Sequence, residues 1–395
     1  MSARWRTARR ILCVRLDSLG DVLMCTPAMR ALRQALPGRS IALLASPSGA
    51  AAAPFIPEVD EVIVHRAAWV KHAPDGAAPG AGADDGLALV ATLAAGAFDG
   101  AVIFTTYTQS ALPAALLCQL AGIPLRLAHC RENPYGLLSD WAPEPEPASM
   151  VRHEVQRQLA LALRIGGTSP DLRLSFAPRQ GDVAAARQRL RQAGVDPDRP
   201  WILLHPGASA ASRRWPAALW ARLLRLLADR PGLPLVLTGG AAEAALADAI
   251  RLAAGVPAVS LAGQLDLGEL GALMGMAAVA VTNNTGPAHI AAAVGTPLVE
   301  LYALTNPQHT PWAVPNRVLF QDVPCRFCYK SDCPAGHHAC LAGVAPERVA
   351  EAVLELLPRR AARTGADADA DTAACRPPRA PPGAAPTALP SADAA

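Results

Sequence analysis

Short apolar runs alternate along the chain with longer segments in which apolar residues recur every three or four positions. The short runs predict buried strands, and the longer segments predict helices. The expected strands are residues 11–14, 41–44, 62–64, 101–104, 125–128, 201–204, 235–238, 259–261, 278–282 and 298–302. The clearest expected helices are residues 151–164, 217–228 and 346–357. Regular alternation of strand and helix predicts parallel sheets with helices on both faces, which is an α/β fold.

The expected strands fall into two sets, and a chain of 395 residues is longer than a single core usually supports. We predict an N-terminal Rossmann-like domain at residues 1–175, a linker region at 176–200 and a C-terminal Rossmann-like domain at 201–358. The linker region is weakly patterned and contains several prolines. Residues 359–395 are mostly alanine, proline and aspartate, which predicts a disordered tail, and residues 73–86 predict a mobile loop.

Two acidic residues follow the first expected strand, in the turn that leads to a helix. They are Asp17 and Asp21. In open parallel sheets, ligands bind outside the carboxyl ends of the strands, where this turn lies. Asp21 can cap the helix, because the helix dipole favours a carboxylate at this end. It can also act as a general base that takes a proton from a substrate hydroxyl, and Asp17 is the rival for that role.

A second polar turn follows the expected strand 278–282 and opens a helix of small residues. Thr285 can cap this helix, and Pro287 lies where a missing N–H does no harm. The free N–H groups and the positive dipole end predict a phosphate site. His289 follows four residues after Thr285, so both side chains should face the same opening. The alternative is an ordinary capped helix with a satisfied histidine.

A third polar turn follows the expected strand 201–204 and carries two adjacent arginines, Arg213 and Arg214, before Trp215 and Pro216. Guanidinium groups pair bidentately with phosphate oxygens, so this turn suits a diphosphate. The alternative is a solvated basic turn.

Together these motifs resemble glycosyltransferase family 9, the ADP-heptose:lipopolysaccharide heptosyltransferase family, over about residues 10 to 357. Four segments carry the resemblance: Leu19-Gly20-Asp21-Val22, Arg213-Arg214-Trp215-Pro216, Leu237-Thr238-Gly239-Gly240-Ala241-Ala242-Glu243 and Asn284-Thr285-Gly286-Pro287-Ala288-His289. There are three departures from the family pattern. Arg213 stands where lysine is frequent, Asn284 stands where an acid is frequent, and Glu243 is offset by about one residue.

The resemblance implies a GT-B fold, with two Rossmann-like domains facing across a cleft, the first of them on the acceptor side. It implies an inverting, metal-independent glycosyltransferase that moves heptose from ADP-heptose onto a lipopolysaccharide core or another glycan acceptor. Asp21 would be the base, and Glu243 would approach the donor ribose. The donor diphosphate would be bound by Arg213, Asn284, Thr285, Gly286 and His289.

Two other functions fit the same architecture. A nucleotide-sugar epimerase would need no acceptor, but the Gly20-Asp21 turn fits the transferase pattern better. A non-catalytic paralogue would bind a nucleotide sugar, or a partner protein through its cysteine-rich loop, but it would have no need of a base.

Charge and hydropathy exclude other classes of protein. The net charge of +3 is too small to indicate nucleic-acid binding, although a mildly basic chain suits contact with an anionic membrane surface. The first apolar run is cut short by Arg15 and Asp17, so no signal-peptide core forms. No apolar stretch reaches the roughly 18 to 20 residues that span a bilayer. We therefore expect a cytoplasmic protein, peripheral at most to the inner face of the inner membrane.

Four of the nine cysteines lie in a loop at residues 325–340, at Cys325, Cys328, Cys333 and Cys340. In a cytosolic protein, clustered cysteines are metal ligands or reduced thiols more often than disulfides. Structural zinc prefers such ligands, so a zinc site that pins this loop is one interpretation. The spacing is not that of a standard zinc finger, so reduced thiols are the alternative.

Overall fold

The computed structural model describes residues 3–70, 83–230 and 232–358. Its strands are β1 Arg10–Arg15, β2 Ser40–Ala45, β3 Glu61–Val64, β4 Gly100–Ile103, β5 Leu125–Cys130, β6 Asp140–Pro143, β7 Ile202–His205, β8 Leu235–Leu237, β9 Val259–Ser260, β10 Val279–Asn283, β11 Leu298–Leu301 and β12 Asn316–Leu319. Its α-helices are α1 Leu19–Gln34, α2 Pro47–Ala50, α3 Ala83–Ala95, α4 Leu112–Leu120, α5 Glu154–Arg164, α6 Gln180–Gln192, α7 Ala217–Asp229, α8 Ala244–Ala254, α9 Leu267–Met276, α10 Gly286–Ala293, α11 Ala339–Ala342 and α12 Pro346–Leu356.

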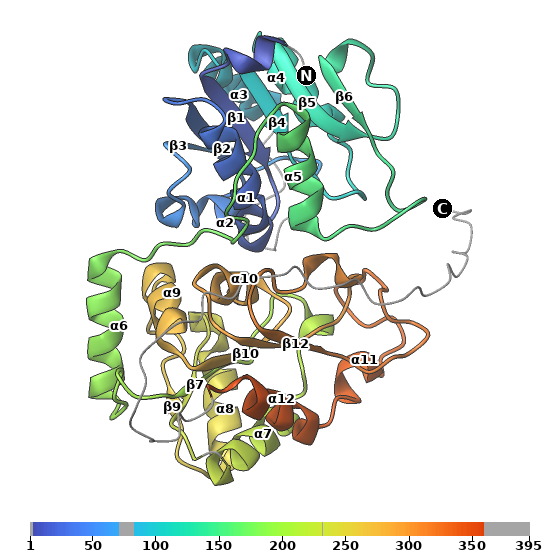
Figure 1. The fold of residues 1–395 in the computed structure, drawn as a ribbon. Coiled ribbons are helices and arrows are strands. Elements are labelled where there is room, and N and C mark those ends of the chain that lie inside the picture. The colour runs from blue at the N-terminus through green and yellow to red at the C-terminus, as the bar shows by residue number, and fades with distance from the viewer. Residues whose placement is uncertain (1–2, 71–82, 231, 359–395) are drawn as a thin grey trace, which may run out of the picture. The chain divides into compact units, whose positions relative to one another are not determined.

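The strands form two six-stranded sheets, and all neighbouring strands are parallel (Figure 1). The first sheet has the order β3-β2-β1-β4-β5-β6, and the second has the order β12-β11-β10-β7-β8-β9. The first order is the 3-2-1-4-5-6 arrangement of a Rossmann sheet, and the second is the same arrangement when it is read from β9 and its strands are numbered from β7 as strand 1. The prediction of an α/β fold with two Rossmann-like parallel sheets is confirmed.

Residues of the central strands alternate between two layers of helices. In β1, Ile11 and Cys13 belong to the same apolar cluster as residues of α1 and α5, whereas Leu12 and Val14 cluster with residues of α3 and α4. The second sheet is covered in the same way, by α6, α9 and α10 on one face and by α7, α8 and α12 on the other. Burial on both faces explains why the strands are nearly continuous apolar runs.

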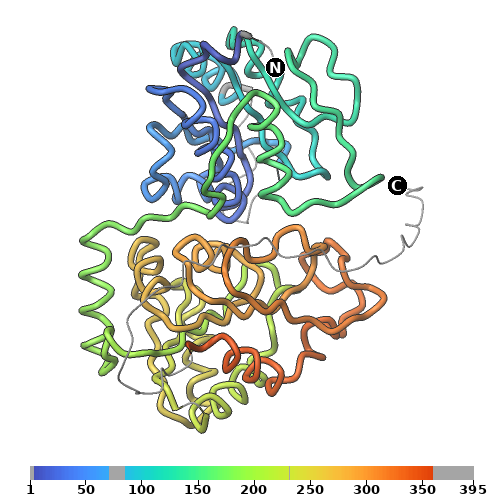
Figure 2. The backbone as a smooth tube through the Cα atoms, viewed as in Figure 1, coloured from blue at the N-terminus to red at the C-terminus, as the bar shows by residue number. Residues whose placement is uncertain are grey.

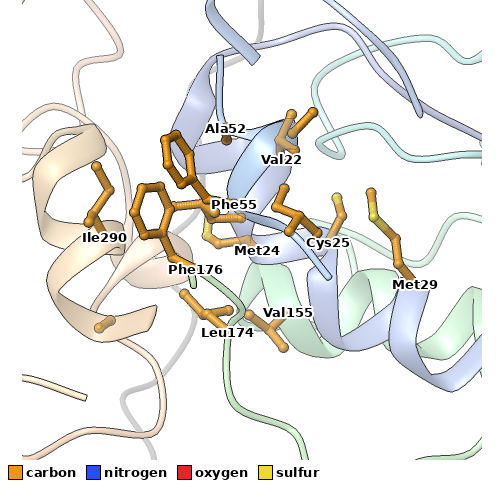
Figure 3. Packing of buried hydrophobic residues seen from close by; sticks show 14 of the residues in the cluster. Val22, Met24, Cys25, Met29, Ala52, Phe55, Val155, Leu174, Phe176 and Ile290 are labelled. Atoms are coloured by element: carbon orange, nitrogen blue, oxygen red, sulfur yellow. The ribbon is translucent and has the colours of Figure 1, made fainter. Parts of the chain in front are cut away.

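One apolar cluster continues from the first sheet to the second (Figure 3). Helix α1 contacts helix α10, and the cluster includes Met24 of α1 and Ile290 of α10. The segment that follows α5 joins it through Phe176, whose ring stacks on Phe55 with centroids 4.6 Å apart. This packing brings the beginnings of α1 and α10 close together, and both beginnings carry predicted site residues.

Three predicted helices are present as α5, α7 and α12, whereas β6, β12 and α6 are among the elements that the sequence pattern missed. Strands β6 and β12 lie at sheet edges, where little of a strand is buried and the apolar signal is weak. Helix α6 lies inside the predicted linker region 176–200, and the tube in Figure 2 shows the chain reaching it after α5. Only Ala186 and Leu190 of α6 are buried, which explains its weak periodicity. The predicted domain limits remain a prediction.

Two other predictions fall mostly outside the described residues. They are the tail at 359–395 and the loop at 73–86, of which only the last residues are described, as the beginning of α3. No helix within residues 3–70, 83–230 and 232–358 is long and apolar enough to cross a membrane.

Candidate active site

Each sheet has one point at which the strand order reverses, and each reversal point carries predicted site residues. In the first sheet the point lies between β1 and β4, and in the second it lies between β7 and β10. Loops at such a point diverge to opposite faces and leave a crevice for a ligand. The first turn of α1, just after β1, carries Asp21; the loop after β7 carries Arg213, and the loop after β10 carries Thr285.

These three segments line one cavity of about 90 Å³. Its lining residues are Ser18, Asp21, Met24, Arg213, Asn284, Thr285, Gly286, His289 and His309. Every residue predicted to be catalytic or to bind the donor diphosphate is therefore in the same place. Gly20 permits the approach, because a Cβ at this position would collide with the ring of His289.

A buried arginine organises the acids at the end of β1. The Arg15 side chain is 0% exposed and forms three ion pairs. Its Nε lies 2.8 Å from Oδ2 of Asp17, its Nη2 lies 3.1 Å from Oδ1 of Asp21, and its Nη1 lies 2.7 Å from Oε1 of Glu154. Glu154, at the start of α5, also accepts a 2.7 Å hydrogen bond from Nε2 of Gln158. Sequence reasoning missed Arg15 and Glu154, although a charged residue in an apolar strand was a usable signal.

Asp21 both caps helix α1 and lines the cavity. Its Oδ2 accepts hydrogen bonds from the backbone N–H of Ser18 at 3.1 Å and from the Ser18 hydroxyl at 2.6 Å. Burial would raise the pKa of the Asp21 carboxyl, but Arg15, His309 and Ser18 outweigh burial and lower the pKa to about 2. Asp21 is therefore an ionised carboxylate at neutral pH, and both of the roles predicted for it are compatible with its position.

Asp17 lies in a different environment. Burial raises its pKa, although Arg15 acts in the opposite direction. Its Oδ1 accepts a 2.5 Å hydrogen bond from Nε2 of Gln109. Asp17 lines a separate cavity of about 110 Å³, together with Trp69 and Phe104, and it does not line the cavity that holds Asp21.

Around the second reversal point, several polar atoms are buried without a hydrogen-bond partner among the described residues. They are Oγ1 of Thr285, Nδ1 of His289, Nδ1 of His309 and Nε of Arg213. Thr285 is the N-cap of α10, as predicted, but its hydroxyl makes no capping bond. Burial lowers the pKa of His289 to about 3 and that of His309 to about 4, so both rings are neutral at neutral pH. Unpaired donors at a helix start suit an anionic ligand.

Other predicted residues have different partners. The Asn284 amide ties the ends of β10 and β11 together, donating to the carbonyl of Ala303 at 2.9 Å and accepting from its N–H at 3.3 Å. Arg214 does not line the cavity, and its Nε donates to the carbonyl of Ala208 at 2.7 Å. Glu243 also lies outside the cavity, where its Oε2 accepts from the N–H of Gly240 at 2.8 Å. Its role at a ribose remains a prediction.

Sequence reasoning also missed two titratable residues near Arg213. His309 lies in the cavity, in a short 3-10 helix at Pro307–His309 that carried no sequence signal. Glu300 is fully buried in β11, and neither carboxylate oxygen has a hydrogen-bond partner among the described residues. Burial raises the pKa of Glu300 well above its usual range, and Arg213 opposes that rise. An acid inside an apolar strand could have been noticed, as Arg15 could.

The four loop cysteines form no coordination sphere in the structure. Sγ of Cys325 lies 3.9 Å from Nε2 of His337. Within residues 3–70, 83–230 and 232–358, no group of three or more histidine, cysteine, aspartate or glutamate side chains is arranged to hold a metal ion. A zinc site at Cys325, Cys328, Cys333 and Cys340 remains a prediction, and no step of the chemistry is assigned to it.

Known proteins are similar to this chain in sequence and in fold. Residues 87–339 match the profile of glycosyltransferase family 9 (heptosyltransferase). The chain is 31% identical over 258 residues to lipopolysaccharide heptosyltransferase 2 of Escherichia coli K12, covering 63% of this chain and 73% of that protein. It is 27% identical over 343 residues to lipopolysaccharide heptosyltransferase 1 of Pseudomonas aeruginosa, covering 82% of this chain and 87% of that protein. The solved E. coli ADP-heptose lps heptosyltransferase II matches with a TM-score of 0.66 and 26% identity, covering 88% of this chain and 98% of that chain.

The profile match spans more than half of the chain and includes the two loops that carry Arg213 and Thr285. The structural match extends the similarity over most of the first sheet as well as the second. The resemblance predicted from short motifs is confirmed, and the chain belongs to glycosyltransferase family 9.

Proposed function

We propose that this protein transfers heptose from ADP-heptose to a lipopolysaccharide core acceptor, with inversion at the anomeric carbon. The single observation that carries the proposal is the shared cavity, in which an ionised Asp21 lies with Arg213, Thr285 and His289. A transferase needs a base for the acceptor and an electropositive site for the leaving diphosphate, and this cavity holds both. The relatives named as lipopolysaccharide heptosyltransferases support the choice of donor and acceptor.

In the proposed reaction, Asp21 takes the proton from an acceptor hydroxyl while that oxygen attacks the anomeric carbon. The bond from the anomeric carbon to the diphosphate oxygen breaks in the same step, so the configuration inverts. Arg15 supports this role, because it holds Oδ1 of Asp21 at 3.1 Å and helps to keep the carboxylate ionised. Asp21 is favoured over Asp17 as the base because it is the one that lines the cavity with Arg213.

The negative charge on the departing diphosphate is stabilised, in this proposal, by Arg213 and by the N–H groups at the start of α10. Fixed donors that meet developing charge usually contribute most of the rate enhancement. His289 and Thr285 offer neutral hydrogen bonds to the same oxygens, because His289 is uncharged at neutral pH. This arrangement supports a metal-independent reaction, for which full activity in excess EDTA is the expected result.

We further propose that the protein acts in the cytoplasm and approaches its acceptor at the inner face of the inner membrane. Structural zinc at the cysteine-rich loop is kept as a separate proposal. Its test is the zinc content of the purified protein, before and after dialysis against a chelator.

The proposed function is tested in two steps. Protection against thermal unfolding is measured with ADP-heptose, UDP-sugars and GDP-sugars, and transfer is then measured onto truncated lipopolysaccharides. Selective protection by ADP-heptose, followed by transfer, is the expected result. Protection by a different nucleotide sugar would contradict the donor assignment. Donor binding without transfer to any acceptor would favour a binding protein, and turnover of donor alone to an isomeric nucleotide sugar would favour an epimerase.

A further inference from the structure

A second polar cavity, of about 180 Å³, lies in the first half of the chain at the carboxyl ends of β4 and β5. None of the residues assigned above to the base or to the donor lines it. The side chains that give this cavity its chemistry are Tyr107, Gln109, His129, Arg131, Glu132 and Glu144. Because carboxyl strand ends are where ligands bind in such sheets, its position indicates a substrate site.

One lining residue has an unused hydrogen-bonding atom. His129 is 7% exposed, and its Nε2 lies 3.3 Å from the carbonyl of Arg157. Its Nδ1 is buried without a partner among the described residues. A buried polar atom without a partner is costly unless water or a ligand satisfies it. His129 therefore supports the interpretation of the cavity as a binding site.

The charges of the lining suit a neutral ligand better than an anion. The cavity holds one guanidinium, that of Arg131, whose Nη2 already donates to the backbone carbonyls of Tyr107 at 2.8 Å and Glu146 at 3.1 Å. It holds two carboxylates, those of Glu132 and Glu144. Glu144 forms an ion pair with Arg157, outside the lining. Glu132 accepts a 2.8 Å hydrogen bond from the hydroxyl of Ser110, and its own backbone N–H, Ser110 and the nearby Arg131 lower its pKa. An acidic ligand would meet this carboxylate, but a ligand with many hydroxyls could donate to it.

The cavity is connected to the proposed base. Strand β4 lies between β1 and β5, so the end of β5 is about two strand spacings, or ~10 Å, from the end of β1. Gln109 lines the cavity and donates to Asp17, which is ion-paired to the Arg15 that holds Asp21. A ligand in this cavity would therefore reach toward the site of proton transfer.

The same loop is also held by the second half of the chain. The hydroxyl of Tyr107 lies 2.9 Å from that of Tyr329 and accepts a 3.1 Å hydrogen bond from Nδ2 of Asn306. The rim of the cavity is thus fixed by residues from both halves, as expected for a site that must place one substrate against another.

We propose that this cavity binds a neutral, hydroxyl-rich sugar ring of the acceptor, in preference to an acidic or phosphorylated sugar. The inference rests on the proposed function, because it identifies the acceptor class of that same transferase. A volume of about 180 Å³ is enough for on the order of ten water-sized groups, which is the scale of one sugar ring. Glu132 favours a neutral sugar over an acidic one, because its carboxylate repels an anionic group and accepts hydrogen bonds from hydroxyls.

The test compares two deacylated core oligosaccharides, one ending in a neutral heptose and one ending in an acidic sugar. Binding of each to the full chain is measured without donor, and transfer is measured with ADP-heptose. The variants are Glu132→Ala and Glu132→Gln, at an exposed position. Glu61→Gln is the matched control, because Glu61 is an exposed acid at the amino end of β3, on the other side of the sheet.

The wild-type protein should bind the neutral oligosaccharide more tightly than the acidic one. Glu132→Ala should weaken binding of the neutral oligosaccharide, and raise its KM, by about tenfold, as for loss of a hydrogen bond to a charged group. The KM for ADP-heptose should not change. Glu132→Gln should reduce the difference in affinity between the neutral and the acidic oligosaccharide. Glu61→Gln should change neither the affinity for the neutral oligosaccharide nor this difference.

Tighter binding of the acidic oligosaccharide by the wild-type protein would overturn the inference, and so would unchanged binding in both Glu132 variants. Binding that follows the predicted pattern without any transfer would support the cavity assignment and contradict the proposed function. The two proposals can therefore fail separately.

Discussion

The two reversal points of the molecule have the same strand topology but differ in how their arginines are paired with charge. At the first, Arg15 is surrounded by Asp17, Asp21 and Glu154 at 2.7 to 3.1 Å. At the second, Arg213, Thr285 and His289 present buried atoms that have no hydrogen-bond partner among the described residues. A network of ion pairs holds its side chains in one geometry, whereas buried polar atoms without a partner can be satisfied by a ligand.

The difference also concerns charge. Three carboxylates surround one guanidinium at the first point, so an anionic donor would be repelled there. The second point has Arg213 and the positive end of α10. This division explains how one cavity can direct a diphosphate to one side and an acceptor hydroxyl to the other.

The largest expected effect comes from removing Arg15, the centre of the ion-pair network. Arg15→Met would leave Glu154 as a buried charge without its cation, which typically costs about 3–5 kcal/mol of unfolding free energy. Urea unfolding of the two proteins measures the loss. Arg15→Lys keeps the charge but cannot reach three carboxylates with a fork of donors, so it should lose less stability. An Arg15→Met protein as stable as the wild type would show that the network is not structural.

At the second reversal point, Arg213→Ala should lower kcat by about 100-fold or more, which is the usual cost of removing one hydrogen-bond donor to developing charge. Stability should change little, because Nε of Arg213 has no partner to lose among the described residues. Steady-state transfer assays measure the effect, with Arg214→Ala as the matched control. A similar loss in both variants would mean that the turn, rather than Arg213, matters.

The comparison separates what the sequence could predict from what it could not. The helix start that holds Thr285 and His289 could be predicted from the sequence, because a capping residue, a proline and small residues mark it locally. Only the family resemblance predicts that Asp21 and Arg213 lie in one site. Their proximity depends on packing between α1 and α10, and these two helices are far apart in the sequence. The network around Arg15 was missed because its partner Glu154 comes from another helix, α5.

The pH dependence of stability provides a smaller test of the second point. The pKa of His289 is lowered to about 3, against about 6.5 in an unfolded chain. Between these values the unfolded state binds the extra proton, so the contribution of His289 to stability falls as the pH falls. From pH 7 to pH 5, the wild type should lose about 2 kcal/mol relative to His289→Gln. Urea unfolding at both pH values measures this difference, and a constant difference would contradict the neutral, buried histidine.

Substitution of Glu300 should have the smallest effect on stability, and its pH dependence should be opposite to that of His289. Its pKa is raised by burial, so the folded state keeps a proton that the unfolded state releases as the pH rises. Glu300 therefore lowers the free energy of unfolding more and more as the pH increases. Glu300→Gln, which mimics the protonated acid, should stabilise the protein by on the order of 1 kcal/mol at neutral pH. Thermal unfolding at pH 6 and pH 8 should show a larger gain at pH 8. Destabilisation at both would indicate an ionised Glu300 with a partner.

The most direct measurement compares Asp21→Asn with Asp17→Asn, using donor protection and transfer rate on the same preparations. We predict that Asp21→Asn keeps thermal protection by ADP-heptose and loses about 1,000-fold in kcat, within the range for a lost general base. Asp17→Asn, which changes a carboxylate outside the shared cavity, should retain far more activity. Near-normal turnover by Asp21→Asn, or the larger loss in Asp17→Asn, would contradict the assignment of the base.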